Sequence, residues 1–322
     1  MVLDHLTINK TQIGSLSGSD HLTIQLNAFL LSCRVDGLAP ATLKNYQYQL
    51  GRFVSFCNSL LAADNLLPGN NITAQQIRLF LLKLRETNSP VSVGDYYKAI
   101  KRFFNWLVEE GLIEKTPMQN IKPPKKEEKI IRPFSQQDID NLLLLCSGNR
   151  FVDLRNKAII LMFLDTGLRL SELAKIQRTD LNSECEIIKV MGKGAKERVV
   201  RIGKTAQKAL LRYLLNRQDA YPCVWVTEER KPLSAAGIQI AIKKLCHRAE
   251  ITDAKCGPHT FRHTFATMAL KNGANVFYVQ ALLGHSTLMM TRKYAATIDS
   301  ETAVNSHVAF SPIDCISKRR TE

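Results

Sequence analysis

Six residues whose side chains bind phosphate or transfer protons occur in a fixed order in the second half of this chain. They are Arg169, Lys193, His259, Arg262, His285 and Tyr294. An arginine guanidinium stays charged at any working pH and holds phosphate oxygens through a planar fork of donors. Two such groups can stabilise the added negative charge of a pentavalent phosphate, a task that many nucleases give to metal ions. The set therefore predicts metal-free transfer of a phosphodiester to a protein side chain.

The tyrosine of this set fits the nucleophile. A phenol has a pKa of roughly 10, so it needs a base or a strong positive field before it attacks phosphorus. The departing 5′ oxygen needs a proton, which an ammonium or an imidazolium can give. Tyr294 therefore fits the attacking group, while Lys193, His259 and His285 fit the proton transfers.

Each position also has an ordinary structural interpretation. An arginine after Gly167 can lie at the surface or cap a helix, and a lysine between Gly192 and Gly194 can lie in a solvated hairpin turn. A histidine after Gly284 can interact with a helix C-terminus, and a tyrosine can simply pack. The order of the whole set, rather than any one residue, favours the chemical interpretation.

Two other kinds of site are disfavoured. A P-loop carries its lysine after the last glycine and before a helix, whereas Lys193 lies between two glycines in a β-type pattern. His259 and His263 have a spacing that can hold zinc, but no glutamate follows the first histidine and no third ligand is evident. We therefore expect no metal, no cofactor and no small-molecule substrate, and we expect His263 to pack or to support its neighbours.

The segments around the six residues resemble the tyrosine recombinases, also called the phage integrase family. These segments are TGLRLSEL, GKGAKERVV, HTFRHTFAT, LLGH and TRKYA, in this order, with the spacing of compact Xer-type members. The resemblance is strong over about residues 134 to 300 and looser over 20 to 115. Two departures, Phe261 in place of a common leucine and Ala295-Ala296 after the tyrosine, remove no reacting group.

The resemblance implies a role for each candidate. The two arginines clamp the phosphate, Lys193 protonates the 5′ oxygen, and His259 is the general base. His285 binds the phosphate or assists, and Tyr294 becomes joined to the DNA 3′ phosphate.

The same resemblance implies a site-specific recombinase that cuts and rejoins double-stranded DNA through a 3′-phosphotyrosyl intermediate and a Holliday junction. Four protomers, identical or shared with a related recombinase, are expected to act on two DNA sites without ATP. Integration or excision of a mobile element, resolution of dimers and inversion of a segment all stay open. The alternatives are a type IB topoisomerase and a DNA-binding module with an inactive site, and the six filled positions disfavour the second.

Composition favours a basic globular protein. The chain has 322 residues, a hydrophobic fraction of 45% and a net charge of +15, which suits an acidic partner. The possible DNA contacts are Lys125, Lys126, Lys196, Arg198, Arg201 and Arg292. Eight cysteines without a C-x-x-C pair predict reduced core thiols. With no signal peptide and no membrane span evident, we expect a cytoplasmic protein associated with the bacterial nucleoid and with no membrane.

The chain is expected to be mainly α-helical, with a small β-hairpin, in two domains. Residues 1–19 are expected to form a flexible N-terminus, 20–119 a four-helix core-binding (SAM-like) domain and 120–133 a linker rich in proline and charge. Residues 134–300 are expected to form the catalytic domain and 301–322 a C-terminal tail, which the resemblance implies packs on a neighbouring subunit.

Apolar residues at helical spacing form four stripes in the first domain. The stripes are Leu22-Leu26-Phe29-Leu30-Cys33, Leu43-Tyr46-Leu50-Phe53-Val54-Cys57-Leu61, Ile77-Phe80-Leu81-Leu84 and Ile100-Phe103-Phe104-Leu107. Thr73 and Ser135 are expected to cap helices. In the second domain, 186–191 and 198–202 are expected to form the hairpin and 224–226 a short strand.

Side-chain directions are expected for the residues near the candidates. On a helix over about 260–272, Phe261, Phe265 and Met268 are expected to face the core, which leaves His259, Arg262 and His263 toward a cleft. Glu172 is expected to cap its helix or orient Arg169. Tyr278, the rival of Tyr294, is expected to lie in the core.

Overall fold

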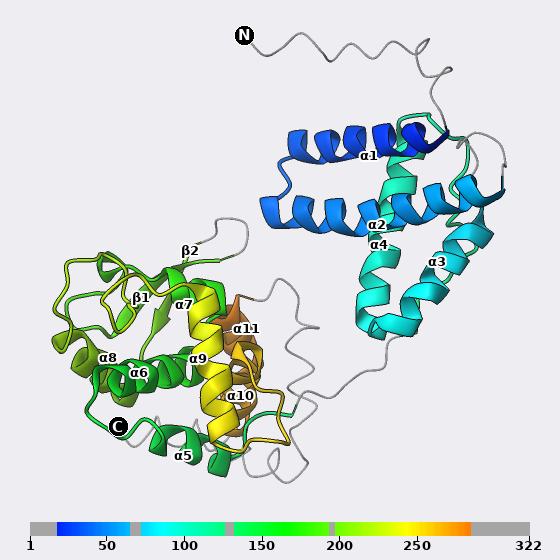
Figure 1. Ribbon diagram of the computed structural model, residues 1–322. Coiled ribbons are helices and arrows are strands. Elements are labelled where there is room, and N and C mark those ends of the chain that lie inside the picture. The colour runs from blue at the N-terminus through cyan, green and yellow to red at the C-terminus, as the bar shows by residue number, and fades with distance from the viewer. Residues whose placement is uncertain (1–17, 65–71, 126–131, 193–196, 285–322) are drawn as a thin grey trace, which may run out of the picture. The chain divides into compact units, whose positions relative to one another are not determined.

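The structure is a computed structural model that describes residues 18–64, 72–125, 132–192 and 197–284. The chain divides into two compact units, which we call the N-terminal unit (1–129) and the C-terminal unit (130–322). The described residues contain eleven α-helices and one two-stranded antiparallel sheet (Figure 1), so the expected helical fold with a small hairpin is confirmed. The expected flexible N-terminus and the C-terminal tail lie outside the described residues.

Four helices make up the described part of the N-terminal unit. They are α1 (Gly18–Val35), α2 (Pro40–Asp64), α3 (Ala74–Thr87) and α4 (Pro90–Glu109). Thr73 caps α3 as predicted, because its hydroxyl accepts from Gln76 N–H while the Gln76 side chain accepts from Thr73 N–H. Ser89 caps α4, and a proline follows at the first helical position, where an N–H has no helical partner to lose.

The predicted apolar stripes meet in one aromatic core. Phe29, Phe53 and Phe103, from three of the helices, are fully buried. The rings of Phe29 and Phe103 meet edge-on with centroids 5.5 Å apart, and Phe53 meets Phe80 at 5.2 Å. Burying one such ring contributes roughly 1.5–3 kcal/mol. These contacts hold the four helices together.

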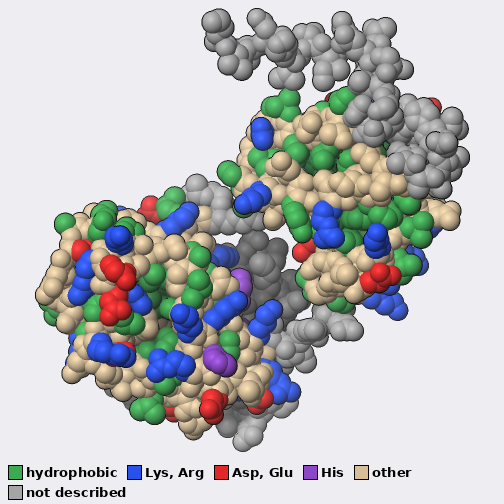
Figure 2. Space-filling view, in the orientation of Figure 1, with side chains coloured by type: hydrophobic (Ala, Val, Ile, Leu, Met, Phe, Trp, Pro, Cys, Tyr) green, Lys and Arg blue, Asp and Glu red, His purple; other side chains and the backbone are tan. Residues whose placement is uncertain are grey.

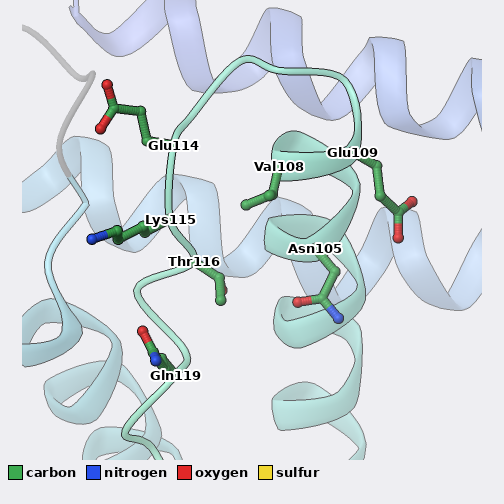
Figure 3. A pocket seen from close by; sticks show the side chains of 7 residues that line it. All are labelled: Asn105, Val108, Glu109, Glu114, Lys115, Thr116 and Gln119. Carbon is green, nitrogen blue, oxygen red and sulfur yellow. The ribbon is translucent and has the colours of Figure 1, made fainter.

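The segment that follows α4 turns back along that helix. The hydroxyl of Tyr97 donates a buried hydrogen bond of 2.8 Å to the carbonyl of Ile121, which fixes the returning segment. Figure 3 shows a small pocket between this segment and α4, and its lining residues are Asn105, Val108, Glu109, Glu114, Lys115, Thr116 and Gln119. All of them belong to the N-terminal unit.

The described part of the C-terminal unit contains seven helices, a 3₁₀ turn and the hairpin. The elements are α5 (Gln136–Leu144), α6 (Phe151–Thr166), α7 (Leu170–Lys175), η2 (Arg178–Asp180), β1 (Ile187–Met191), β2 (Glu197–Arg201), α8 (Lys204–Leu215), α9 (Ala235–Arg248), α10 (Pro258–Lys271) and α11 (Val276–Leu283). Ser135 caps α5 through the predicted capping box. β1 and β2 pair antiparallel with Ile187 opposite Arg201, so the predicted hairpin is confirmed.

Two long-range hydrogen bonds fix the helices that carry the candidate residues. Trp225 is fully buried, and its Nε1 donates to the carbonyl of Leu173 at 2.8 Å, which ties α7 to the core. The backbone N–H of Phe134 donates to Thr264 Oγ1 at 2.9 Å, which ties the start of the unit to α10. α10 packs against α6, and α7 packs against α9.

Three local expectations are wrong. The segment 224–226 is not a strand, because Val226 makes only an isolated bridge with Pro232. On α10, Phe261 lies in the core as expected, but Met268 reaches the surface instead of the core. Arg262 and His263 are buried where α6 and α11 pack on this helix, while His259 is exposed. Tyr278 is 71% exposed, because α11 turns Val279 toward the core instead.

The thiols of the described residues behave as core side chains. Seven free cysteines lie in these ranges, and five of them are buried. Burial raises the pKa of the Cys57 thiol to about 12 and that of Cys146 to about 11. Both are therefore protonated at neutral pH. Of the helices that the structure describes, none is both long enough and apolar enough to cross a membrane.

Candidate active site

The turn between α6 and α7 places Arg169. Gly167 ends α6 at a φ of 60°, a left-handed conformation that glycine adopts without steric cost. Arg169 is then the N-cap residue of α7, and its N–H donates to Oε2 of Glu172 at 2.9 Å. Its Nη1 donates to Oε1 of the same carboxylate at 2.8 Å. Glu172 therefore both caps the helix and orients the guanidinium, as expected.

Arg262 reaches the same turn from α10. Its side chain is buried, and its Nη1 donates to the carbonyl of Gly167 at 2.7 Å. Its Nη2 donates to the carbonyl of Leu283 at 2.5 Å, while Nη2 of Arg169 donates to the carbonyl of the next residue, Gly284, at 3.2 Å. The structure thus brings the two predicted clamp residues together at the end of α11.

A third arginine completes this arrangement. Arg198 on β2 donates from Nε to the carbonyl of Leu282 at 3.0 Å. Three successive carbonyls, those of Leu282, Leu283 and Gly284, therefore each accept from a different arginine. The last carbonyls of a helix lack intrahelical partners and carry partial negative charge, so guanidinium groups are favourable there. The end of α11 is a place where three positive charges can gather at low cost.

Glu172 balances this positive charge. Its side chain is 3% exposed, and it accepts from Arg198 through both oxygens, at 2.9 and 2.8 Å, in addition to its contacts with Arg169. Burial alone raises the pKa of this carboxyl, but the hydrogen bonds from Arg198 and Arg169 outweigh it and lower the pKa to about 2. The carboxylate is therefore fully charged at any physiological pH, and it holds two guanidiniums at once.

His259 lies one helical turn before Arg262 on α10. Pro258 occupies the first helical position, and the imidazole of His259 is exposed, as a group that must meet an external substrate requires. His263, four residues further on, is buried. Its position fits the expectation that this histidine packs within the unit.

Several predicted residues lie outside the described part of the chain. They are the candidates Lys193, His285 and Tyr294, and the possible DNA contacts Lys126, Lys196 and Arg292. Two of them are related to the site by their place in the sequence. Lys193 falls between β1 and β2, and His285 directly follows Gly284, whose carbonyl accepts from Arg169.

The remaining predicted DNA contacts differ from one another. Lys125 is exposed, and Arg201 keeps 78% of its side chain exposed while pairing with Glu186 at 3.2 Å. Arg198 is only 14% exposed, and all three of its side-chain nitrogens donate to protein acceptors. Its guanidinium is therefore engaged within the C-terminal unit, a pairing with Glu172 that the sequence alone could not show, and its contact with DNA stays a prediction.

The C-terminal unit also has a basic face that was not predicted from the sequence. The exposed basic side chains on and just after α9 are Lys243, Lys244, His247, Arg248 and Lys255. Figure 2 shows Lys and Arg side chains together with histidines on the face that α9 and α10 form. The signal in the sequence was the pairing of basic residues four apart, at 243 and 247 and at 244 and 248, which puts them on one side of a helix.

Metal-ligating side chains do not gather in the described ranges, which hold no group of three His, Cys, Asp or Glu residues arranged to bind an ion. The donor set at the end of α11 is instead cationic. Its chemistry is that of anion binding.

Comparison with known proteins places both units. Residues 133–301 match the phage integrase family, and residues 26–114 match the phage integrase N-terminal SAM-like domain. Tyrosine recombinase XerD of Halalkalibacterium halodurans is 30% identical over 277 residues, which are 84% of this chain and 91% of that protein. Tyrosine recombinase XerC of a Shewanella strain is 34% identical over 266 residues, which are 80% of this chain and 84% of that protein.

A solved structure shares the fold. The XerH site-specific recombinase, crystallised in a post-cleavage complex with its palindromic difH substrate, superposes with a TM-score of 0.76 at 17% identity. The match covers 92% of this chain and 98% of that one.

Proposed function

Because this chain belongs to the phage integrase family, we propose that it is a site-specific recombinase that cuts and rejoins double-stranded DNA through a tyrosine. One observation in the structure carries the proposal. Arg169 and Arg262, which come from different helices, meet on the carbonyls of the consecutive residues Leu283 and Gly284. Two guanidiniums so placed can hold the two non-bridging oxygens of one phosphodiester.

The proposed reaction exchanges one phosphodiester for another. The phenolic oxygen of Tyr294 forms a bond to phosphorus while the bond from phosphorus to the 5′ oxygen breaks. His259 takes the phenolic proton, and Lys193 gives a proton to the 5′ oxygen. His285 binds the phosphate or assists. The products are a 3′-phosphotyrosyl link and a free 5′ hydroxyl, and attack by a 5′ hydroxyl of a partner duplex reverses the step.

The proposed roles of the two units follow the domain limits of the sequence. Residues 20–119 hold the DNA, 120–133 link the units and 134–300 carry out the chemistry, while 301–322 pack on a neighbouring subunit. We propose four protomers on two DNA sites, identical or shared with a related recombinase, acting at the bacterial nucleoid in the cytoplasm. Exchange between two sites proceeds through a Holliday junction and serves either dimer resolution or movement of a mobile element.

A suicide substrate tests the chemistry directly. A nick next to the scissile phosphate lets the freed end diffuse away, so the covalent adduct accumulates and migrates slowly on a denaturing gel. We expect adduct from the unaltered protein and none from Tyr294→Phe. Tyr278→Phe is the matched control, because this tyrosine is exposed on α11 and should leave adduct formation unchanged. Adduct from Tyr294→Phe, or its loss in Tyr278→Phe alone, would show that the nucleophile is misassigned.

The same substrate separates the alternatives. A DNA-binding module with an inactive site shifts the DNA on a native gel but never becomes attached to it. A type IB topoisomerase forms the adduct at many sites and relaxes a supercoiled plasmid without pairing two duplexes. A recombinase forms it at particular sequences, so sequencing the DNA trapped by the protein in cells identifies the site and the kind of recombination.

A further inference from the structure

We infer that Arg198 is a positioning residue of the proposed active site. By binding Glu172 and the Leu282 carbonyl, it fixes the positions of the Arg169 side chain and of the end of α11. The inference rests on the proposed function. It replaces the interpretation of Arg198 as a DNA contact, and it assigns to a strand residue a part in the cleavage step without contact to the substrate.

The geometry of Arg198 uses its whole guanidinium. Nη1 and Nη2 donate to the two oxygens of Glu172 at 2.9 and 2.8 Å, and Nε donates to the Leu282 carbonyl at 3.0 Å. A Cβ on Gly284 would lie 3.4 Å from Nη1 of Arg198, so the guanidinium passes close beside the backbone there. The fork and the third donor have separate acceptors, and only an arginine supplies all three.

Glu172 links Arg198 to Arg169. One carboxylate holds both guanidiniums, so Oε1 accepts from Arg198 and from Arg169. Without Arg198, the carboxylate is free to rotate onto Arg169 alone, which moves a proposed phosphate ligand. The Leu282 carbonyl at the same time loses its arginine partner, two residues before the Gly284 carbonyl that Arg169 holds.

The end of α11 is the second element that Arg198 sets. The helix stops at Gly284, in the left-handed conformation with a φ of 62°, and His285 follows. Arg198 thereby ties β2 to α11, the helix that directly precedes His285, the proposed phosphate-binding histidine. Displacement of reacting groups by about 1 Å can slow a reaction roughly 100-fold.

Arg201 provides the contrast within the same strand. It lies three residues after Arg198, but its side chain is 78% exposed and pairs with Glu186 near the surface. A phosphate contact contributes to affinity and to its salt dependence, whereas a positioning residue contributes to the rate of the bound complex. The two arginines should therefore fail in different assays.

The experiment measures binding and cleavage separately on a nicked suicide substrate, with the full chain. Arg198→Ala should slow single-turnover cleavage at saturating protein roughly 100-fold. Its dissociation constant and its salt slope should stay within about twofold of the unaltered protein. Arg201→Ala should instead weaken binding and reduce the salt slope by about one. Arg212→Ala, on the exposed face of α8, controls for the loss of one positive charge.

Two further variants show whether Arg198 acts through Glu172. Arg198→Lys keeps the charge but lacks the fork of donors. It should therefore cleave roughly tenfold faster than Arg198→Ala but more slowly than the unaltered protein. Combining Arg198→Ala with Glu172→Gln should slow cleavage no more than the slower single change, because residues that act through one another are not additive. If the double variant slows cleavage by the product of the two single effects, the inference is overturned. It is also overturned if Arg198→Ala cleaves at the wild-type rate but binds DNA more weakly.

The outcomes distinguish this inference from the proposed function. If the unaltered protein forms no adduct, the proposed function fails. If it forms the adduct and Arg198→Ala cleaves equally fast, only the positioning role fails. Melting curves report whether each variant folds, and if Arg198→Ala does not, a wild-type cleavage rate in Arg198→Lys overturns the inference by itself.

Discussion

Replacing Glu172 by glutamine is expected to destabilise the C-terminal unit by about 3 kcal/mol at pH 7. Glutamine keeps the size of the side chain but removes the charge that faces two guanidiniums. The same substitution turns one acceptor oxygen into an NH₂ donor beside arginine donors. Removing one partner from a buried charge network typically costs about 3–5 kcal/mol, which agrees with this figure.

The magnitude comes from the pKa of the carboxyl group. Burial opposes ionisation, but the hydrogen bonds from Arg198 and Arg169 lower the pKa of Glu172 from 4.5 to about 2 on folding. Each pH unit between these values corresponds to about 1.4 kcal/mol. Because the folded-state pKa is the lower one, the stabilisation is complete above pH 4.5 and is lost as the pH falls toward 2.

The chain offers a clean reporter for this measurement. It has two tryptophans, and Trp106→Phe leaves only Trp225, which is fully buried in the C-terminal unit. Trp225 also donates to the carbonyl of Leu173, the residue after Glu172, so its fluorescence follows this part of the fold. Urea unfolding in this background, with and without Glu172→Gln, gives the free-energy difference at each pH.

The pH dependence decides the outcome. The difference in unfolding free energy between the unaltered protein and Glu172→Gln should stay constant from pH 7 to about 5. It should then shrink by about 1.4 kcal/mol for each pH unit below the unfolded-state pKa. Glu186→Gln is the matched control, since its single pair with Arg201 lies near the surface and should contribute less than about 1 kcal/mol. A gap below about 1 kcal/mol for Glu172→Gln, or one that does not change between pH 7 and 3.5, would refute the reasoning.

Two further substitutions test the supports of the site. Gly167→Ala should destabilise the C-terminal unit by about 3 kcal/mol, because a Cβ there requires a left-handed alanine and overlaps the Phe265 ring and a Leu283 methyl; a change below about 1 kcal/mol in Trp225-detected unfolding would contradict this. Thr264→Val should lower the free energy of unfolding by about 1–3 kcal/mol, because the buried N–H of Phe134 loses its acceptor. Hydrogen exchange at the Phe134 amide should become faster, and an unchanged exchange rate would contradict the prediction.

Much of the fold could be predicted from the sequence where local signals agree. The caps at Thr73 and Ser135 act within three residues of chain, and their hydroxyls accept the predicted bonds. The four apolar stripes of the N-terminal unit repeat over several helical turns, so their inward face was unambiguous. The hairpin was predictable because Gly192 and Gly194 interrupt two β-type segments.

The errors arose where tertiary partners decide. α11 has eight residues and reads VFYVQALL, so it has almost no polar face to orient it, and Tyr278 was assigned to the wrong side. The polar residues of α10 are buried because two other helices cover them, which no periodicity reveals. The pairing of Arg198 with a glutamate 26 residues earlier was not an error of this kind but was unforeseen, because a basic residue on a strand carries no sign of such a partner.

Part of the candidate site was also predictable from the sequence, and part of it was not. The motif order identified Arg169 and Arg262, and the structure adds that both rest on the end of α11. The roles of Lys193, His285 and Tyr294 stay predictions. The basic face of α9 was missed because it carries no motif and becomes visible only once the exposed side of the helix is known.

The bond between Phe134 and Thr264 has a consequence during synthesis, because its partners are 130 residues apart. The N-terminal unit draws its core from the first 121 residues, so it can close while the ribosome is still far from the end of the message. At elongation speeds of roughly 5–20 residues per second, the C-terminal unit waits about 7 to 30 seconds longer for α10 to emerge. A nascent chain thus acquires its proposed grip on DNA before it acquires the means to cut it.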